Sequence, residues 1–180
     1  MDRQPVLEGE TLRLRPLCEG DREALFAVAS DRDLWALHPA HDRWQRPVFD
    51  AMFDEALAQG GALAITVADS GEVVGSSQYR PSALDEGAME IGWTFLARRH
   101  WGGAANREVK RLMIGHALAS VERCVFRVGA ENWRSRRAME KIGGQLTGTT
   151  ETVVYRDLRR ILHVLYAIDR AGFAAGPLKP

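Results

Sequence analysis

Cysteine is scarce in this chain, and long apolar segments are missing. The 180 residues include two cysteines, too few for the disulfide framework of a small secreted domain or for a cysteine-based metal cluster. No apolar run approaches the roughly 20 residues that cross a bilayer, and residues 1–5 lack the apolar core of a signal peptide. We therefore expect a cytoplasmic protein with no membrane partner. We also expect Cys124, which lies in an apolar segment, to be a buried free thiol.

The chain has no net charge, but its charges are unevenly distributed. Residues 1–97 carry 8 basic and 17 acidic side chains, a balance of −9, whereas residues 98–142 carry 11 and 4, a balance of +7. This pattern predicts an anionic ligand near the middle of the chain and a neutral or cationic one near its first half. The alternative is that the charges only solvate helix faces. Nucleic acid is not the expected ligand, because the basic segment has few interleaved aromatics beyond Trp101 and Trp133.

Length and composition indicate one globular domain. A chain of 180 residues can bury roughly 70% of its unfolded surface in one core. Its 46% hydrophobic and 27% charged residues are ordinary for such a domain. We expect a single domain over residues 1–170 and a loose C-terminal tail over residues 171–180.

Hydrophobic periodicity predicts alternating strands and helices. Strands are expected over residues 12–17, 63–67, 72–79, 89–96, 124–129, 153–155 and 161–168, and helices over 21–29, 47–59, 104–120 and 135–142. Asp69-Ser70-Gly71 is a hairpin signal between two of the strands. The predicted fold is α/β, with a mixed and mainly antiparallel central sheet flanked by helices. Residues 89–129 should form its parallel βαβ unit, with the helix as a right-handed crossover.

A small-residue turn, Arg99-His100-Trp101-Gly102-Gly103-Ala104, joins a predicted strand to the start of a helix. Such a junction leaves several backbone N–H groups directed at one place, beside the positive end of the helix dipole, and this suits a phosphate group. The spacing is neither that of a Walker loop nor GxGxxG. It is R-x-x-G-x-A.

The R-x-x-G-x-A turn resembles the pyrophosphate loop of the GNAT superfamily of acetyltransferases. Four further segments are similar to the same family in the same order, so that the resemblance extends from about residue 12 to residue 168. They are Leu12-Arg13-Leu14-Arg15-Pro16, Glu90-Ile91-Gly92-Trp93, Glu131-Asn132-Trp133-Arg134-Ser135 and Met139-Glu140-Lys141-Ile142-Gly143. The most similar branch is the ribosomal-protein N-terminal, or Rim-type, acetyltransferases.

The resemblance implies a site for acetyl-coenzyme A as co-substrate, without a metal. Two neighbouring strands, 89–96 and 124–129, would splay apart to admit the pantetheine arm. Backbone groups of Phe95 and Leu96 would contact that arm, and the amides of Gly102, Gly103 and Ala104 would bind the pyrophosphate. Arg99 and Arg136 are candidates for the adenosine 3′-phosphate, as are Arg98, Arg134 and Arg137, because arginine can bind phosphate through two hydrogen bonds. The chain departs from the family at Ala104, where glycine is commoner, and at Asn106-Arg107.

The same resemblance suggests how the chemistry would be divided. Asn132 would pair with the pantetheine arm, and Ser135 would give a proton or hydrogen bond to the departing thiolate. The alternative for both residues is ordinary helix capping. A protonated amine cannot attack until it loses its proton, and Glu90 is the leading candidate for the base, ahead of Glu151 and His163.

The aromatic and histidine-rich residues 35–44 are expected to cover the acceptor. Trp35, His38 and Trp44 are candidate acceptor-binding residues, and simple packing is the alternative. No metal is expected at His38-x-x-His41, because no further ligand motif accompanies the pair.

The predicted function is therefore transfer of an acetyl group from acetyl-coenzyme A to a primary amine by direct attack. The acceptor would be a small molecule or a peptide, and a homodimer is possible. The alternative function is a regulatory module that binds coenzyme A with little or no catalysis.

Overall fold

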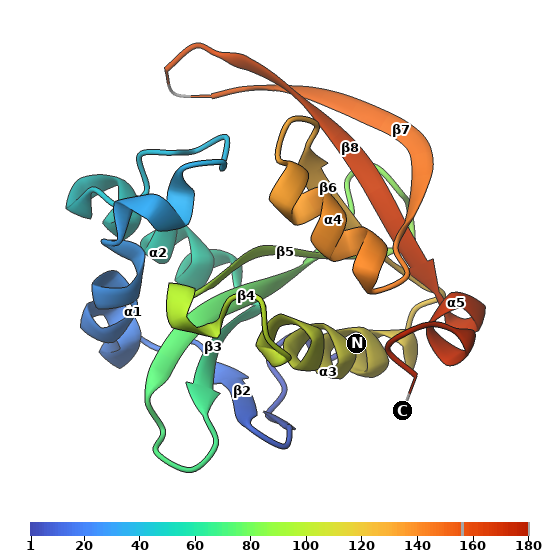
Figure 1. Ribbon diagram of the computed structural model, residues 1–180, viewed down its shortest axis with the longest axis horizontal. Coiled ribbons are helices and arrows are strands. Elements are labelled where there is room, and N and C mark those ends of the chain that lie inside the picture. Colours follow the sequence, from blue (N-terminus) through green and yellow to red (C-terminus); the bar gives the residue numbers. More distant parts are fainter. Residues whose placement is uncertain (156, 180) are drawn as a thin grey trace.

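One eight-stranded sheet organises the protein (Figure 1). The computed structural model describes residues 1–155 and 157–179. The strands are β1 (Leu7–Glu8), β2 (Leu12–Pro16), β3 (Ala62–Val67), β4 (Val73–Pro81), β5 (Met89–Leu96), β6 (Arg123–Gly129), β7 (Gln145–Val154) and β8 (Arg160–Asp169). The helices are α1 (Arg22–Ala29), α2 (Arg46–Gln59), α3 (Ala105–Leu118), α4 (Trp133–Lys141) and α5 (Arg170–Ala175). None of the helices in this described part of the chain has the length and apolar character needed to cross a bilayer.

The strand order is β1-β2-β3-β4-β5-β6-β8-β7. All neighbours are antiparallel except β5 and β6, which are parallel and are joined through α3. This confirms the predicted mixed α/β fold with its mainly antiparallel sheet and single βαβ crossover. A parallel pair needs such a crossover because the chain must return to the same end of the sheet.

The two faces of the sheet carry separate apolar clusters. On one face, α3 and α4 contribute Met113, Ile114 and Met139 to a cluster with Leu14 and Ile91 of the strands. On the other face, α1 and α2 pack their own cluster against β3 and β5. Proline in the first turn starts α2, and Gly60, at φ 67°, ends it.

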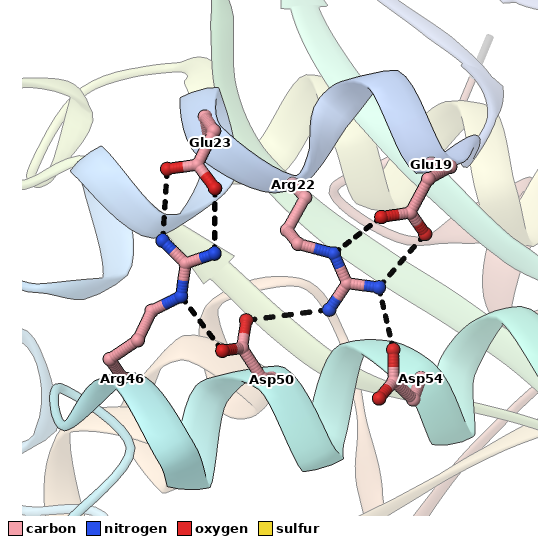
Figure 2. Close-up of polar contacts among 6 residues, drawn as sticks. All are labelled: Glu19, Arg22, Glu23, Arg46, Asp50 and Asp54. Atoms are coloured by element: carbon pink, nitrogen blue, oxygen red, sulfur yellow. Dashed lines mark hydrogen bonds and ion pairs between the residues drawn. The ribbon is translucent and has the colours of Figure 1, made fainter.

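Six charged residues join α1 to α2 (Figure 2). They are Glu19, Arg22, Glu23, Arg46, Asp50 and Asp54. Arg22 contacts Glu19 and Asp54 at 2.5 and 2.6 Å, and Arg46 contacts Glu23 and Asp50 at 2.6 and 2.8 Å. Both guanidinium groups also lie over phenylalanine rings of the opposite helix, at 4.4 Å for Arg22 and 4.8 Å for Arg46. Exposed ion pairs stabilise little individually, so the network mainly fixes how the two helices lie against each other.

The structure differs from the sequence prediction in the last third of the chain. Strand β7 spans ten residues, whereas the sequence predicted three. The prediction was too short because the strand is exposed and rich in threonine, so it lacks the alternation of a half-buried strand. Its pairing with β8 also shifts register between Leu146 and Thr150, around Gly148 at φ +84°. The expected loose tail is wrong as well. Asp169 caps α5 by accepting from the Gly172 N–H at 2.7 Å, and Leu178 is buried in the main core.

Candidate active site

Strands β5 and β6 start as neighbours and then diverge. They pair only at Met89 with Cys124 and at Glu90 with Val125. Beyond these positions β6 keeps its other edge on β8 through Gly129, and β5 keeps its other edge on β4. The facing edges therefore present backbone N–H and C=O groups without strand partners, which is the arrangement an extended ligand can complete. The predicted splayed pair is confirmed.

A bulge bends β5 immediately after the divergence. The register with β4 shifts between Ser76 and Gln78, and Trp93 has a φ of 53°, which is rare for a bulky residue. Such backbone strain persists only where the surrounding structure enforces it, and it is concentrated at functional sites. Here the bulge turns the Trp93 side chain toward the face covered by α1 and α2, where it lines a cavity.

The turn after β5 presents backbone amides at the start of α3. Gly102 has a φ of +73°, and Ala104 is the N-cap of α3 without a side-chain cap. Within the described residues, no acceptor is found for the N–H groups of Gly102, Gly103 and Ala104. Ala104 itself has a φ of −77°, so its methyl group causes no strain. The departure from glycine at this position is therefore compatible with the turn, since the left-handed residue is Gly102.

The arginines proposed for phosphate already have protein partners. Arg99 pairs with Glu72 at 2.6 Å on the surface. Arg136 donates to the Tyr166 hydroxyl and to the Ala130 carbonyl, both at 3.1 Å. A phosphate would have to compete with these contacts, and a 3′-phosphate role for either arginine stays a prediction.

Arg134 lies nearer the amide turn than its neighbours on α4. Its guanidinium lies 4.2 Å from the centre of the Trp101 ring and donates to the Leu34 carbonyl at 3.0 Å. Arg134 thus links α4, which follows β6, to the turn that follows β5.

Asn132 and Ser135 lie at the start of α4, after the end of β6. The Asn132 Oδ1 accepts the Ser135 N–H at 3.1 Å, so the capping contact that was the alternative is present. That contact uses the backbone of Ser135 and leaves its hydroxyl uncommitted, with no partner found for it in the described part of the chain. Capping and a role in chemistry are therefore compatible.

Glu90 is buried at the last position where β5 and β6 pair. Its side chain is 9% exposed, and its Oε1 lies 3.3 Å from Nε of Arg127 on β6. Arg127 also holds Glu151 at 2.7 Å. Burial raises the pKa of Glu90, and the guanidinium groups of Arg127 and Arg80 oppose that rise only in part. A carboxylate with a raised pKa is suited to accept a proton near neutral pH.

His163 forms a second candidate relay with Tyr155. The His163 Nδ1 lies 3.2 Å from the Ile161 carbonyl, and Nε2 lies 3.0 Å from the Tyr155 hydroxyl. If Nδ1 carries the proton, Nε2 can accept from the tyrosine. Burial lowers the pKa of His163, which favours the neutral ring. Tyr155 was not singled out in the sequence, although the predicted strand 153–155 includes it, because its contact with His163 forms only when β7 pairs with β8.

A cavity of about 190 Å³ lies on the α1–α2 face beside β5. Its lining includes Leu25, Asp42, Arg43, Phe49, Met52, Phe53, Glu55, Arg80, Trp93, Phe95, Tyr155, Asp157 and Arg159. The β7–β8 hairpin and residues 39–43 both contribute side chains to this lining. Arg159 joins the two by donating to the Pro39 carbonyl at 2.6 Å. We call this space the β5–α2 cavity.

The aromatic residues expected to bind the acceptor lie behind the β5–α2 cavity. Trp35 is 2% exposed, and its ring N–H donates to the Ala29 carbonyl at 2.7 Å. Trp44 packs against the same cluster under Arg32, and the His38 Nδ1 accepts the Ala40 N–H at 2.9 Å. None of the three lines the cavity, and their role in acceptor binding stays a prediction.

Lys110 is a buried cation that the sequence reasoning overlooked. Its side chain lies on the core-facing side of α3, where it donates to the Thr94 hydroxyl of β5 at 2.8 Å. Its Nζ also lies 5.3 Å from the ring centre of Phe126 on β6. Burial lowers the pKa of Lys110 to about 7. The sequence signal that could have identified Lys110 as buried is its spacing of three and four residues from Met113 and Ile114, both of which are buried.

The comparisons with known proteins agree with this geometry. The model of the family described as "Acetyltransferase (GNAT) domain" matches residues 11–145. The chain belongs to the GNAT acetyltransferase family. Among curated proteins, it is 25% identical over 164 residues to the Bacillus subtilis protein described as "Uncharacterized N-acetyltransferase YoaA", covering 85% of this chain and 90% of YoaA.

Solved structures share the fold of this GNAT protein. A probable GNAT-family acetyltransferase from Chromobacterium violaceum superposes with a TM-score of 0.82 at 23% identity, covering 94% of this chain and 88% of the other. RimJ of Mycobacterium smegmatis, solved in complex with CoA-disulfide, superposes with a TM-score of 0.68 at 19% identity, covering 97% and 90%. GNAT proteins use acetyl-coenzyme A, and the residues present fit it. The amide turn offers donors without acceptors, and the diverging strands offer unpaired edges. No cluster of three metal-ligating side chains occurs in residues 1–155 and 157–179.

Proposed function

We propose that this GNAT protein transfers an acetyl group from acetyl-coenzyme A to a primary amine by direct attack. The observation that supports it most strongly is the divergence of β5 from β6 between the amide turn and the β5–α2 cavity. A ligand held by the turn and the strand edges would extend toward a cavity where an acceptor can enter. Neither cysteine suits an acyl carrier: Cys18 is on the surface, and burial raises the pKa of Cys124 to about 12.

The cofactor would be held by the predicted residues. The amides of Gly102, Gly103 and Ala104 would bind the pyrophosphate, and the edge of β5 at Phe95 and Leu96 would pair with the pantetheine arm. When bound, acetyl-coenzyme A supplies a thioester whose carbonyl carbon accepts the amine.

The protein would then move two protons. Glu90 would accept, directly or through water, the proton that the ammonium must lose before its nitrogen forms the new C–N bond. Ser135 would donate a hydrogen bond or proton to the sulfur as the C–S bond breaks. Each step uses a group that the structure places beside the divergence or at the start of α4.

Titration with acetyl-coenzyme A tests the proposal directly. We expect calorimetry to detect one site per chain and a broad panel of amines to include one that releases free thiol. Gly102→Ala should weaken binding about 10-fold, because alanine at a φ of +73° costs roughly 1–2 kcal/mol. Gly87→Ala is the matched control, since Gly87 has a φ of +79° in a different loop with open space around it. Absence of binding at millimolar concentration would contradict the proposal, and binding without thiol release would favour the regulatory module.

Ser135→Ala separates chemistry from binding. We expect it to lower kcat about 10-fold or more while the Kd for acetyl-coenzyme A changes less than about 2-fold, since the capping contact uses the Ser135 backbone. Steady-state kinetics and calorimetry on the same preparation measure both. If the variant instead loses affinity with kcat preserved, Ser135 is a binding residue.

Three finer assignments are part of the same proposal. Placement in the Rim-type branch is supported by the likeness to RimJ, which at 19% identity concerns the fold. A cytoplasmic location and a homodimer are the further assignments, and fractionation and light scattering would test them.

A further inference from the structure

The β5–α2 cavity is lined by three carboxylates, those of Asp42, Glu55 and Asp157, yet one of its arginines pairs with none of them. Three arginines line it: Arg43, Arg80 and Arg159. Arg159 pairs with Asp157 at 2.5 Å, and Arg80 lies 3.3 Å from Glu55. Arg43 forms no ion pair with any residue of the described chain.

Arg43 is partly buried, and no carboxylate of the described chain compensates its positive charge. Its Cζ lies 5.5 Å from the centre of the Trp35 ring, and its nearest polar side chain is His38, with Nη1 and Nε2 3.5 Å apart. Burial lowers the pKa of Arg43. A half-buried guanidinium has lost part of its hydration, and without a carboxylate that loss is not compensated. An anionic group on a ligand would compensate it.

Arg80 also has a hydrogen-bond donor that the described part of the protein leaves without a partner. Its Nε is buried and has no hydrogen-bond partner within the described residues, although Nη1 and Nη2 are engaged by Glu55 and Gln78. The guanidinium lies 3.7 Å from the centre of the Trp93 ring at the bulge of β5. Two arginines with unused donors therefore line one cavity beside the proposed acetyl site.

The rest of the cavity is apolar and small. Leu25 of α1 and Phe49, Met52 and Phe53 of α2 are among its lining residues. A dry cavity of about 150 Å³ can hold a benzene ring, so about 190 Å³ suffices for one apolar side chain with a few more atoms. A carboxylate near the arginines, an apolar group among the phenylalanines and an amine facing β5 together describe an amino acid.

We infer that the acceptor is a free α-amino acid with an apolar side chain, whose carboxylate is bound by Arg43 and Arg80. This rests on the proposed acetyl transfer and names its substrate class. The α-carbon holds the amine and the carboxylate close together, as a cavity of this size requires. A peptide with an acidic first residue offers the same charge on a larger molecule and is a competing outcome of the test.

The test compares L-phenylalanine and L-leucine with their carboxamides, which keep the amine and the side chain but lose the negative charge. We expect kcat/KM for thiol release to be at least about 10-fold higher for the acids than for the amides. Arg43→Gln should reduce kcat/KM for the acids to the value for the amides, and Arg43→Lys should retain part of the preference for the acids. Arg13→Gln is the matched control, because Arg13 pairs with Glu8 outside the cavity.

Binding without cofactor gives an independent measurement. We expect L-phenylalanine to raise the thermal unfolding midpoint of the wild type and of Arg13→Gln, but not of Arg43→Gln. Equal turnover of acids and amides, or preferred turnover of a peptide that begins with glutamate, would overturn the inference and leave the acetyl transfer intact. If no amine releases thiol, the proposed function fails, while the thermal shift still decides whether the cavity binds an amino acid.

Discussion

Glu90→Gln should lower kcat about 100-fold or more while leaving the Kd for acetyl-coenzyme A nearly unchanged. The glutamine keeps the shape of the side chain but cannot accept the proton of the attacking ammonium, and general base catalysis typically contributes at least this factor. Stopped or steady-state assays of thiol release, with calorimetry for the cofactor, measure the two quantities separately.

The pH profile of the wild type should carry the signature of Glu90. A base works only when ionised, and burial raises the pKa of Glu90. The acidic limb of kcat should therefore lie at a higher pH than the usual glutamate pKa of about 4.3, and Glu90→Gln should lose that limb. The free energy of unfolding of Glu90→Gln should be close to that of the wild type. A raised carboxyl pKa means that folding disfavours the charged form, so losing that charge does not destabilise the fold.

Two further variants distinguish the competing bases. Glu151→Gln removes the second carboxylate bound by Arg127, and His163→Gln removes the ring beside Tyr155. We expect each to retain at least a tenth of wild-type kcat. If His163→Gln has the large effect and Glu90→Gln the small one, the base is the Tyr155–His163 pair.

Glu108→Ala should destabilise the protein by about 3 kcal/mol. The carboxylate, in the first turn of α3, accepts the N–H groups of Thr11 and Leu12 at 2.8 and 3.2 Å, and the Thr11 hydroxyl as well. Its removal leaves two backbone donors without acceptors near the core. For a domain of this size the expected fall in Tm is roughly 10 °C, measured by calorimetry. Glu122→Ala, on an exposed turn, should have almost no effect.

The effect of Glu108→Ala should depend on pH in a defined direction. Burial raises the pKa of Glu108, but the hydrogen bonds from Thr11 and Leu12 outweigh it, and the net shift is downward. A lowered carboxyl pKa stabilises the fold above the unfolded pKa of about 4.3, and this contribution is lost as the pH falls through the folded pKa. The difference between wild type and variant should be full at pH 7 and shrink below about pH 4. A difference independent of pH would assign the loss to packing.

Local signals were enough for elements that carry their own periodicity or caps. The strand Met89–Leu96 and the helix ending at Gln59 were predicted within one residue, because apolar residues recur at every second position along most of the first and a glycine stops the second. Only the end of strand β7 was predicted, because pairing with β8 decides the conformation of the rest and its exposed threonines give no pattern. Likewise, Leu178 is buried by residues far from it in sequence.

The candidate site likewise has parts that the sequence predicted and parts that it did not. Motif spacing located the amide turn and the Asn132–Ser135 junction, because backbone geometry there depends on a few neighbouring residues. The β5–α2 cavity was not foreseen, since Arg43, Arg80 and Tyr155 come from three separate segments. Trp35 lies outside the lining of that cavity, and the sequence alone does not distinguish a tryptophan that lines a cavity from one that packs in the core.

By itself, the sequence determined the mixed α/β fold and located the small-residue turn that we propose binds the coenzyme. Those properties reside in hydrophobic periodicity and in small residues at fixed spacing, which act over a few positions. Only the tertiary structure decided that β5 leaves β6 after Glu90, which side chains line the space beyond it, and which arginine lacks a carboxylate. Burial and charge pairing depend on residues distant in the chain, and our proposal for the acceptor rests on those two quantities.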